Sequence, residues 1–540
     1  MLWGEQPDMG ATLRALRALV LLAGFYLLGF VMLGALAAVD WAFAEAGVGA
    51  LTAKIWFISA LVALPIVQGM FALRAPKDEP PPGLSVTPER EPGLWAAVRE
   101  LAELTGTRAP DEIVLTGDVN AAVAEDTRLL GLLPGRRRMY VGLPLMAGLN
   151  EPQLRSVLAH EFGHYTHHDT RLTALTLRGR RQVLRTVANL HERSQEKAAR
   201  EQARLERKNA RRIARGKKAA AVDPGPAGLS YRLAAKPFLW YGTFYLRTSQ
   251  GVARQQELAA DLAAARVAGR DATASALREI PVLDAAHDFY MQSYATLGTG
   301  AGLLPPPGEV FGGLRRLLAA RAAELDELRA GLPEQEQSPY DSHPPIAERV
   351  ARIEELPDDG RTPAGARPAL ALLTDPARAF ADLAAAVLTP EAQRLNRAAD
   401  WPDLVHRSML RQAEQDAEPL RRAVAETQGG DGSLAAFLDA ADAGRLWQLA
   451  DLLPKSPEAQ AATGRAAREF ARPRLRARLA RLVTVELARQ GRAHWELSWT
   501  EAARLRLPDG HEAWLKQALD AVVNDIPDTT ELRRLLAPAT

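Results

Sequence analysis

Two long uncharged apolar runs near the N terminus constrain the fold of this chain more than any other feature. The first runs from Ala18 to Val39 and has 22 residues, and the second runs from Ile55 to Leu73 and has 19. At about 1.5 Å of rise per helical residue, each reaches about 30 Å, the thickness of a bilayer core. We therefore expect residues 1–76 to form a two-span membrane hairpin. The alternatives are a cleaved signal peptide for the first run and a buried helix of a soluble domain for the second.

The basic residues that flank these runs predict the orientation of the hairpin. Arg14 and Arg17 precede the first run, and Arg74 and Lys77 follow the second, whereas the loop between the runs carries Lys54 alone. Basic flanks are retained on the cytoplasmic side of a membrane. We therefore expect an integral protein of the cell (inner) membrane with two spans and the rest of the chain in the cytoplasm.

The composition excludes several classes of protein. The net charge is +2, from 67 basic and 65 acidic residues, so no overall field attracts nucleic acid, and we expect no nucleic-acid partner. The chain has no cysteine, which excludes a disulfide scaffold, a Cys-ligated metal and a thiol nucleophile. A basic stretch at 197–218 favours a solvated helix, with contact to anionic lipid headgroups as the alternative.

The sequence at residues 160–164, His-Glu-Phe-Gly-His, carries the clearest chemistry. On a helix, His160 and His164 share a face because they are four residues apart, so both rings can bind one metal ion. Glu161 is then placed to act as general base toward a water that the metal activates. A signalled helix contains the motif, since Asn150 can cap it and Gln153 can complete a capping box. The alternative is a pair of solvated histidines.

A catalytic zinc requires a third protein ligand and one open position. Glu257 is the best donor, and Asp261 falls on the same helix face four residues later. The alternative for Glu257, which is the commoner case, is an exposed helix glutamate, so its position alone does not identify it as a ligand. Asp261 can accept a hydrogen bond from a ligand imidazole and so fix its tautomer. Asp169, just after the motif helix, is a second candidate for that role.

Four ordered segments resemble the HtpX-like and CAAX-prenyl-protease-like family of membrane zinc metallopeptidases. These segments are NAAVAE from residue 120, VLAHEFGHYTHHDT from 157, RQQELAAD from 254 and SHPPIAER from 342. The resemblance covers residues 90 to 355, and the two-span layout is closer to the HtpX-like proteases than to the many-span prenyl proteases. It implies one Zn²⁺ per chain bound by His160, His164 and Glu257, with Glu161 as the base.

The resemblance also implies roles for three further residues. His343 would face the substrate or the developing oxyanion. Arg349 would support the His343 segment or join the oxyanion site. Asn120 would hydrogen-bond the substrate backbone, with strand 120–125 accepting the peptide as an added β-strand. The plainer alternatives are a helix-capping histidine, a surface arginine and a turn asparagine.

These observations predict an α+β fold in three parts. Residues 1–76 form the membrane hairpin, residues 77–357 a mainly helical zincin-type peptidase domain with a small sheet, and residues 358–540 a mostly helical accessory region of unknown role. Short β-like runs are expected at 112–115, 121–124 and 139–141.

The predicted function is membrane-anchored, zinc-dependent hydrolysis of peptide bonds, in quality control or processing of membrane proteins. The partners implied are polypeptide substrates and membrane lipid, whereas the oligomeric state is not predicted. The alternatives are a processing protease with few substrates, a non-catalytic membrane sensor or scaffold with a zincin fold, and a structural metal site. A structural site would need a fourth ligand, which His167 or His168 would have to supply.

Overall fold

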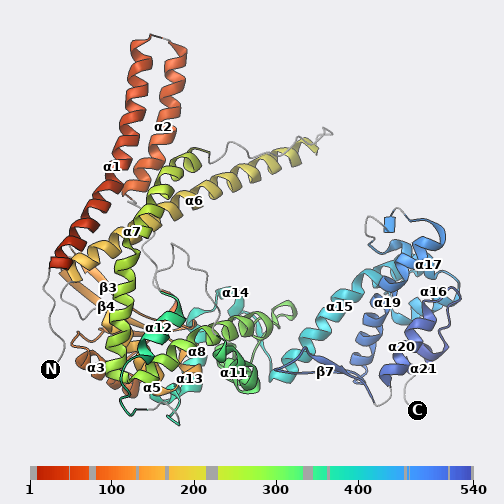
Figure 1. The fold of residues 1–540 in the computed structure, drawn as a ribbon. Coiled ribbons are helices and arrows are strands. Elements are labelled where there is room, and N and C mark those ends of the chain that lie inside the picture. The colour runs from red at the N-terminus through yellow and green to blue at the C-terminus, as the bar shows by residue number, and fades with distance from the viewer. Residues whose placement is uncertain are drawn as a thin grey trace.

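The computed structural model describes most of the chain. The described residues are 9–47, 49–71, 81–128, 133–164, 170–213, 229–331, 344–361, 365–454, 459–460, 462–508 and 511–536. Figure 1 shows an N-terminal helical hairpin that rises from a central body, and a C-terminal helical arm that extends from the other side of that body.

The hairpin consists of α1 (Met9–Glu45) and α2 (Ala50–Phe71). Its candidate spans are Ala23–Glu45 and Ala50–Val67. In the most apolar 18-residue window of each span, only 6% and 17% of the residues, respectively, are buried. Both helices are apolar on all sides, and yet protein covers little of their surface. That pattern is typical of helices surrounded by lipid and matches the predicted two-span hairpin.

The small sheet of the central body has the strand order β1-β2-β4-β3. Strands β2 and β4 are parallel, and the other two pairs are antiparallel, so β3 lies at one edge. The strands are β1 (Gly83–Val86), β2 (Glu112–Thr116), β3 (Ala121–Arg128) and β4 (Leu133–Gly142). The three predicted β-like runs therefore fall on β2, β3 and β4.

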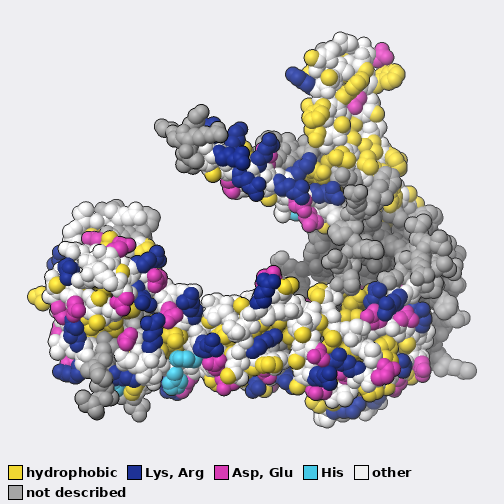
Figure 2. Space-filling model, turned by 180° about the vertical axis from the view of Figure 1, so that it is seen from behind, with side chains coloured by type: hydrophobic (Ala, Val, Ile, Leu, Met, Phe, Trp, Pro, Cys, Tyr) yellow, Lys and Arg dark blue, Asp and Glu magenta, His cyan; other side chains and the backbone are white. Residues whose placement is uncertain are grey.

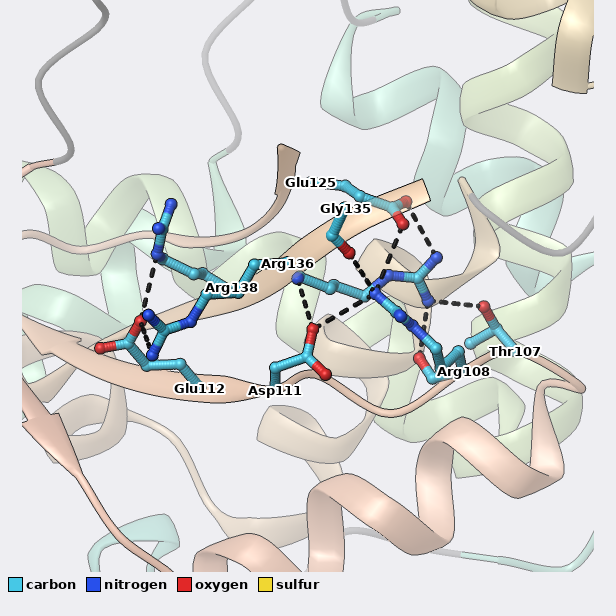
Figure 3. Close-up of polar contacts among 9 residues, drawn as sticks. Thr107, Arg108, Asp111, Glu112, Glu125, Gly135, Arg136 and Arg138 are labelled. Carbon is cyan, nitrogen blue, oxygen red and sulfur yellow. Dashed lines mark hydrogen bonds and ion pairs between the residues drawn. The ribbon is translucent and has the colours of Figure 1, made fainter. Parts of the chain in front are cut away.

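A polar network at one end of the sheet fixes β3 against β4 and the loop before β2 (Figure 3). Buried Arg137 on β4 forms an ion pair with Glu125 on β3, at 3.1 Å, and donates a hydrogen bond to Thr107 at 3.0 Å. The backbone N–H of Arg137 also donates to the carboxylate of Asp111 at 2.7 Å. Because a buried guanidinium needs such partners, the network holds the edge strand in place.

Most helices of the body pack on the sheet and on one another around one large core, whereas α11 and α12 pack in two smaller clusters beside it. The main helices of the body are α3 (Pro92–Leu104), α4 (Leu143–Gly148), α5 (Glu151–Gly163), α7 (Leu229–Ala268), α8 (Arg270–Tyr290), α10 (Leu314–Ala320), α11 (Ala322–Ala330) and α12 (Ile346–Glu354). Shorter elements are a π-helical turn at Met291–Ala295, 3-10 turns at Thr299–Ala301 and Ala369–Leu372, the two-residue strands β5 (Leu303–Leu304) and β6 (Asn396–Arg397), and α9 (Glu309–Gly312).

Two long helices connect the body to the hairpin. Helix α6 (Thr170–Ile213) follows the motif helix α5, and α7 returns from the base of the hairpin to the body. The two helices pack on each other and on the hairpin base, where Val183, Phe238 and Tyr245 share a buried cluster with residues of both spans.

The C-terminal region forms a helical arm with its own hydrophobic core, as the predicted helical pattern indicated. The region begins with α13 (Pro376–Val387), which packs on the core of the body, and α14 (Pro390–Gln393). The arm consists of α15 (Trp401–Gln428), α16 (Leu434–Asp442), α17 (Leu446–Leu452), α19 (Gly464–Arg489), β7 (His494–Glu496), β8 (Arg504–Arg506), α20 (His511–Val522) and α21 (Thr530–Leu536). The core of the body, however, continues from Val86 to Leu404 and so passes the predicted boundary at residue 357. Helix α15 begins in that core and ends in the core of the arm.

Candidate metal centre

The histidines at 160 and 164 lie near the end of α5, and the local sequence explains why this helix forms. The side chain of Asn150 accepts a hydrogen bond from the Gln153 N–H at 3.0 Å, and the Gln153 side chain accepts from the Asn150 N–H, also at 3.0 Å. This capping box satisfies two backbone donors at the helix start. The rings of His160 and His164 lie on one face, with centroids 4.8 Å apart.

Glu257 and Asp261 face α5 from helix α7. Glu257 has one carboxylate oxygen 3.5 Å from Nε2 of His160 and the other 3.8 Å from Nε2 of His164. The two helices approach closely at Gly163, where an added Cβ would lie 2.9 Å from Cα of Ala260. A larger residue at this position would push the helices apart, so Gly163 is what allows donors from both helices to converge.

The donors fit a zinc ion. Two imidazole nitrogens and one carboxylate are the donor set of many catalytic zinc sites, and bonds of about 2.1 Å in a tetrahedron place donor atoms about 3.4 Å apart. The separations of 3.5 and 3.8 Å from Glu257 to the two rings are close to that value. Donor atoms of His160, Glu161 and His164 also lie within 4.8 Å of one another. His160, His164 and Glu257 are thus the residues that would bind the ion.

Asp261 and Arg349 form a buried chain of charges behind His160. Asp261 lies 2.9 Å from Nδ1 of His160, which directs Nε2 of the ring toward Glu257. Arg349 on α12 donates to both oxygens of Asp261, at 2.8 and 2.7 Å. Asp261 is only 1% exposed and Arg349 is 7% exposed, so water screens neither charge.

The carboxylates around His160 perturb its titration. Burial lowers the pKa of His160, but the contacts with Asp261 and Glu257 outweigh burial and raise it to about 9. Burial likewise raises the pKa of Asp261, whereas hydrogen bonds from Arg349 and His160 lower it overall. The site therefore attracts positive charge at Nε2 of His160, which is what a metal cation would supply.

Glu161 lines a cavity of about 120 Å³ that opens beside His160. Helix α8 contributes Thr273, Ala276, Leu277 and Ile280 to the lining of this cavity. Seven of the fourteen lining residues are apolar, and three of these, Ala276, Leu277 and Ile280, lie on α8, so this wall of the cavity suits an apolar substrate side chain. The α8 residues could not be predicted from the sequence, because an amphipathic helix with small residues carries no signal that separates a pocket wall from ordinary core.

Asn120 and Ala121 form the rim of this cavity at the start of β3. Asn120 is exposed, and its carbonyl accepts the Gly142 N–H at 2.8 Å. Since β3 is an edge strand that pairs with β4 on its other side, its outer edge runs beside the cavity.

The remaining candidate residues are placed as follows. Arg349 contacts Asp261 and lies 3.8 Å from Glu257, and it is buried, which excludes the alternative of a surface arginine. These contacts test neither of its two expected roles, support of the His343 segment or a part in the oxyanion site. His343 and Asp169 lie outside the described residues, as do the alternative ligands His167 and His168.

The chain resembles known proteases over the region that contains this site. A model of Peptidase family M48 matches residues 88–357, which is 270 of the 540 residues. A protein described as "Protease HtpX homolog" from Thermoplasma volcanium is 36% identical over 83 residues, which are 15% of this chain and 25% of that relative. The match thus spans about a quarter of the relative's length. No solved structure matches the chain.

Proposed function

Because the chain belongs to peptidase family M48, we propose that it is a membrane-anchored endopeptidase that depends on one zinc ion bound by His160, His164 and Glu257. The observation that carries this proposal is the convergence of two imidazoles and a buried carboxylate next to a cavity and a strand edge. A structural metal site would need no such access for a substrate.

Each residue of the site has a distinct part in the proposed reaction. The edge of β3 binds the substrate backbone as an added strand, with Asn120 at its start, and the cavity takes an apolar side chain adjacent to the scissile bond. Glu161 accepts the proton of the attacking water and then delivers it to the leaving amine. At a site of this kind, zinc supplies activation of the water and polarisation of the scissile carbonyl.

Asp261 and Arg349 act through His160 in this proposal. Asp261 accepts a hydrogen bond from the Nδ1–H of His160, which leaves Nε2 available for the metal. Arg349 holds Asp261 in place through two hydrogen bonds. His343 would contribute a hydrogen bond to the substrate or the oxyanion, as the sequence resemblance implies.

The proposed setting is the cytoplasmic face of the cell membrane, where the hairpin anchors the peptidase body. A peptidase site in a body that is attached to apolar spans favours turnover or processing of membrane or misfolded proteins. A non-catalytic scaffold would have no use for Glu161 beside two metal-binding histidines.

The test is cleavage of casein and self-cleavage by zinc-loaded protein in detergent, compared with Glu161→Gln. Glu192→Gln, an exposed glutamate on α6, is the matched control. We expect cleavage by the parent and the control, and a loss of at least about a hundredfold in Glu161→Gln with zinc still bound. Zinc bound without cleavage in any of the three would favour the scaffold, and failure to bind zinc would overturn the ligand set.

A further inference from the structure

The upper half of α7 carries an exposed apolar patch that the peptidase site does not use. Leu239, Trp240 and Phe244 are 43%, 70% and 49% exposed, and they lie within two turns of one helix. Trp240 is among the most exposed large hydrophobic side chains of the described residues. In water, such a patch is unfavourable, so something apolar is expected to cover it.

The patch lies at the base of the membrane hairpin. The neighbouring residues of α7 contact the lower end of α1: the rings of Phe238 and Phe25 are 5.3 Å apart, and the Tyr241 hydroxyl donates to the Leu21 carbonyl at 2.5 Å. Ile66 and Met70, at the lower end of α2, belong to the same buried cluster. Figure 1 shows this meeting of α7 with the two spans.

The distance from this point to the hairpin tip equals one bilayer core. Twenty helical residues separate Leu21 from Trp41, which is 70% exposed near the tip, and they cover about 30 Å. Tryptophan gathers at both membrane–water interfaces. Trp41 thus marks one interface, and Trp240 lies at the level where the opposite interface must be.

The charges near the patch are those that an anionic surface attracts. Residues 229–256 contain no aspartate or glutamate, and exposed Arg232, Lys236 and Arg247 flank the patch on α7. Residues 197–213 of α6 form a basic arm. The arm extends away from the base of the hairpin, on the same side of the body as the hairpin (Figures 1 and 2). It has seven exposed basic residues and two glutamates. Basic side chains around an aromatic patch are typical of segments that rest on anionic lipid headgroups.

We propose that Leu239, Trp240 and Phe244 insert into the interface of the lipid leaflet on the side of the peptidase body, as a third membrane contact besides the two spans. Two observations favour lipid over a protein partner: the patch is continuous with the hairpin base, and residues 229–256 around it contain no acidic residue.

This contact makes α7 a spacer between the membrane and the catalytic centre. Seventeen residues of the same helix separate Trp240 from Glu257, which corresponds to about 26 Å at 1.5 Å per residue. An extended chain covers this distance with about eight residues. The spacer inference rests on the proposed function: a membrane-anchored substrate is cleaved only at bonds at least about eight residues from its membrane segment.

The lipid contact is tested without any use of activity. The chain has no cysteine, so Phe244→Cys can be labelled alone with an environment-sensitive fluorophore. Phe470→Cys on α19 is the matched control, because Phe470 is also helical and 52% exposed. In nanodiscs of phosphatidylcholine and phosphatidylglycerol with lipid spin-labelled near the headgroup, we expect quenching at 244 several-fold stronger than at 470. Equal quenching at both positions, or a label at 244 that neither spin-labelled lipid nor aqueous iodide reaches, overturns the proposal; the latter would indicate a protein cover.

The spacer is tested with a set of single-span substrates in the same nanodiscs. They share one casein-derived cleavable sequence, which is placed after linkers of increasing length. We expect cleavage to begin near eight linker residues, whereas cleavage after two or three residues contradicts the spacer. Casein itself is the activity control: if it is not cleaved either, the proposed function fails, while the fluorescence result still decides the lipid contact.

Discussion

Replacement of Arg349 by methionine tests how the charges behind His160 act. In the structure, Arg349 donates two hydrogen bonds to Asp261, at 2.8 and 2.7 Å, and Asp261 in turn contacts Nδ1 of His160 at 2.9 Å. The Arg349→Met side chain keeps much of the volume but removes the charge. Asp261, which is 1% exposed, would then be a buried carboxylate with His160 as its remaining charged neighbour.

The expected effect has two parts. Removal of one partner from a buried ion pair typically destabilises a protein by about 3–5 kcal/mol, because the other charge is left without compensation. Loss of a group that orients a metal ligand typically weakens metal binding by about 10- to 100-fold. We therefore expect both effects in Arg349→Met, and a fall in cleavage that excess zinc partly restores.

The assay is zinc affinity by competition with a chelating dye, alongside denaturant unfolding of the metal-free protein. The double variant Asp261→Leu, Arg349→Met is the control, since it removes both charges. Its stability should exceed that of Arg349→Met, whereas its zinc affinity should stay low because His160 has lost its acceptor. If Arg349→Met keeps normal zinc affinity and stability but loses turnover, Arg349 acts on the substrate, and our argument for a supporting role is refuted.

Three further predictions follow from the site. Ala276→Leu should fill the cavity beside Glu161 and lower kcat/KM for peptides with large apolar side chains by about tenfold or more relative to small ones, whereas Ala285→Leu, exposed on the same helix, should not; equal effects would exclude the cavity as a specificity pocket. Because the pKa of His160 is raised from 6.5 to about 9, its proton competes with zinc. Zinc affinity should therefore rise about tenfold per pH unit between about 6.5 and about 9. Over the same interval the metal-free protein should lose stability. A pKa that is raised in the folded state stabilises the fold fully at a pH below the pKa of the unfolded state, and this stabilisation is lost as the pH rises through the pKa of the folded state. A zinc affinity that is constant over this range would contradict the assignment of His160 as a ligand. Finally, Asn150→Ala should destabilise the peptidase body by about 1 kcal/mol through loss of the α5 cap, measured by thermal unfolding, and an unchanged midpoint would show that tertiary packing alone holds the helix.

The hairpin, the motif helix and the sheet strands were predictable because their signals are local. An uncharged run of bilayer length, a capping box and short β-like runs are each signals carried by neighbouring residues of the chain. Helix α5 accordingly begins where Asn150 and Gln153 predict, and α7 ends at Ala268, before Gly269 with its φ of 106°.

The full length of α7 was not predictable from local signals. The sequence predicts a helix around Glu257 and Asp261, and Pro237 and Gly242 favour a break before it. In the structure, one helix of 40 residues continues through both positions. Its contacts with α6 and the hairpin base stabilise this continuous form, and such tertiary contacts are not encoded in the helix itself.

The end of the central core was likewise determined by long-range packing. The change in composition near residue 358 suggested a boundary, but Phe380, Leu383 and Trp401 belong to the same hydrophobic core as the β-sheet. Trp401 also donates to Glu309 at 2.8 Å, across 92 positions of sequence. Composition predicts that this region is helical, whereas it does not predict which hydrophobic core each helix packs against.

The metal centre combines residues that no local signal connects, and this has a consequence for folding. His160 and His164 come from α5, Glu257 and Asp261 from α7, and Arg349 from α12, so the donors converge only after these three helices have packed. A ligand that binds only the folded state stabilises it by about 4 kcal/mol at a thousandfold excess over its Kd. Since α7 also packs on the hairpin base, zinc bound at Glu257 would stabilise the helix that connects the catalytic body to the membrane spans. Metal binding and the attachment of the body to the hairpin would therefore be coupled through one helix.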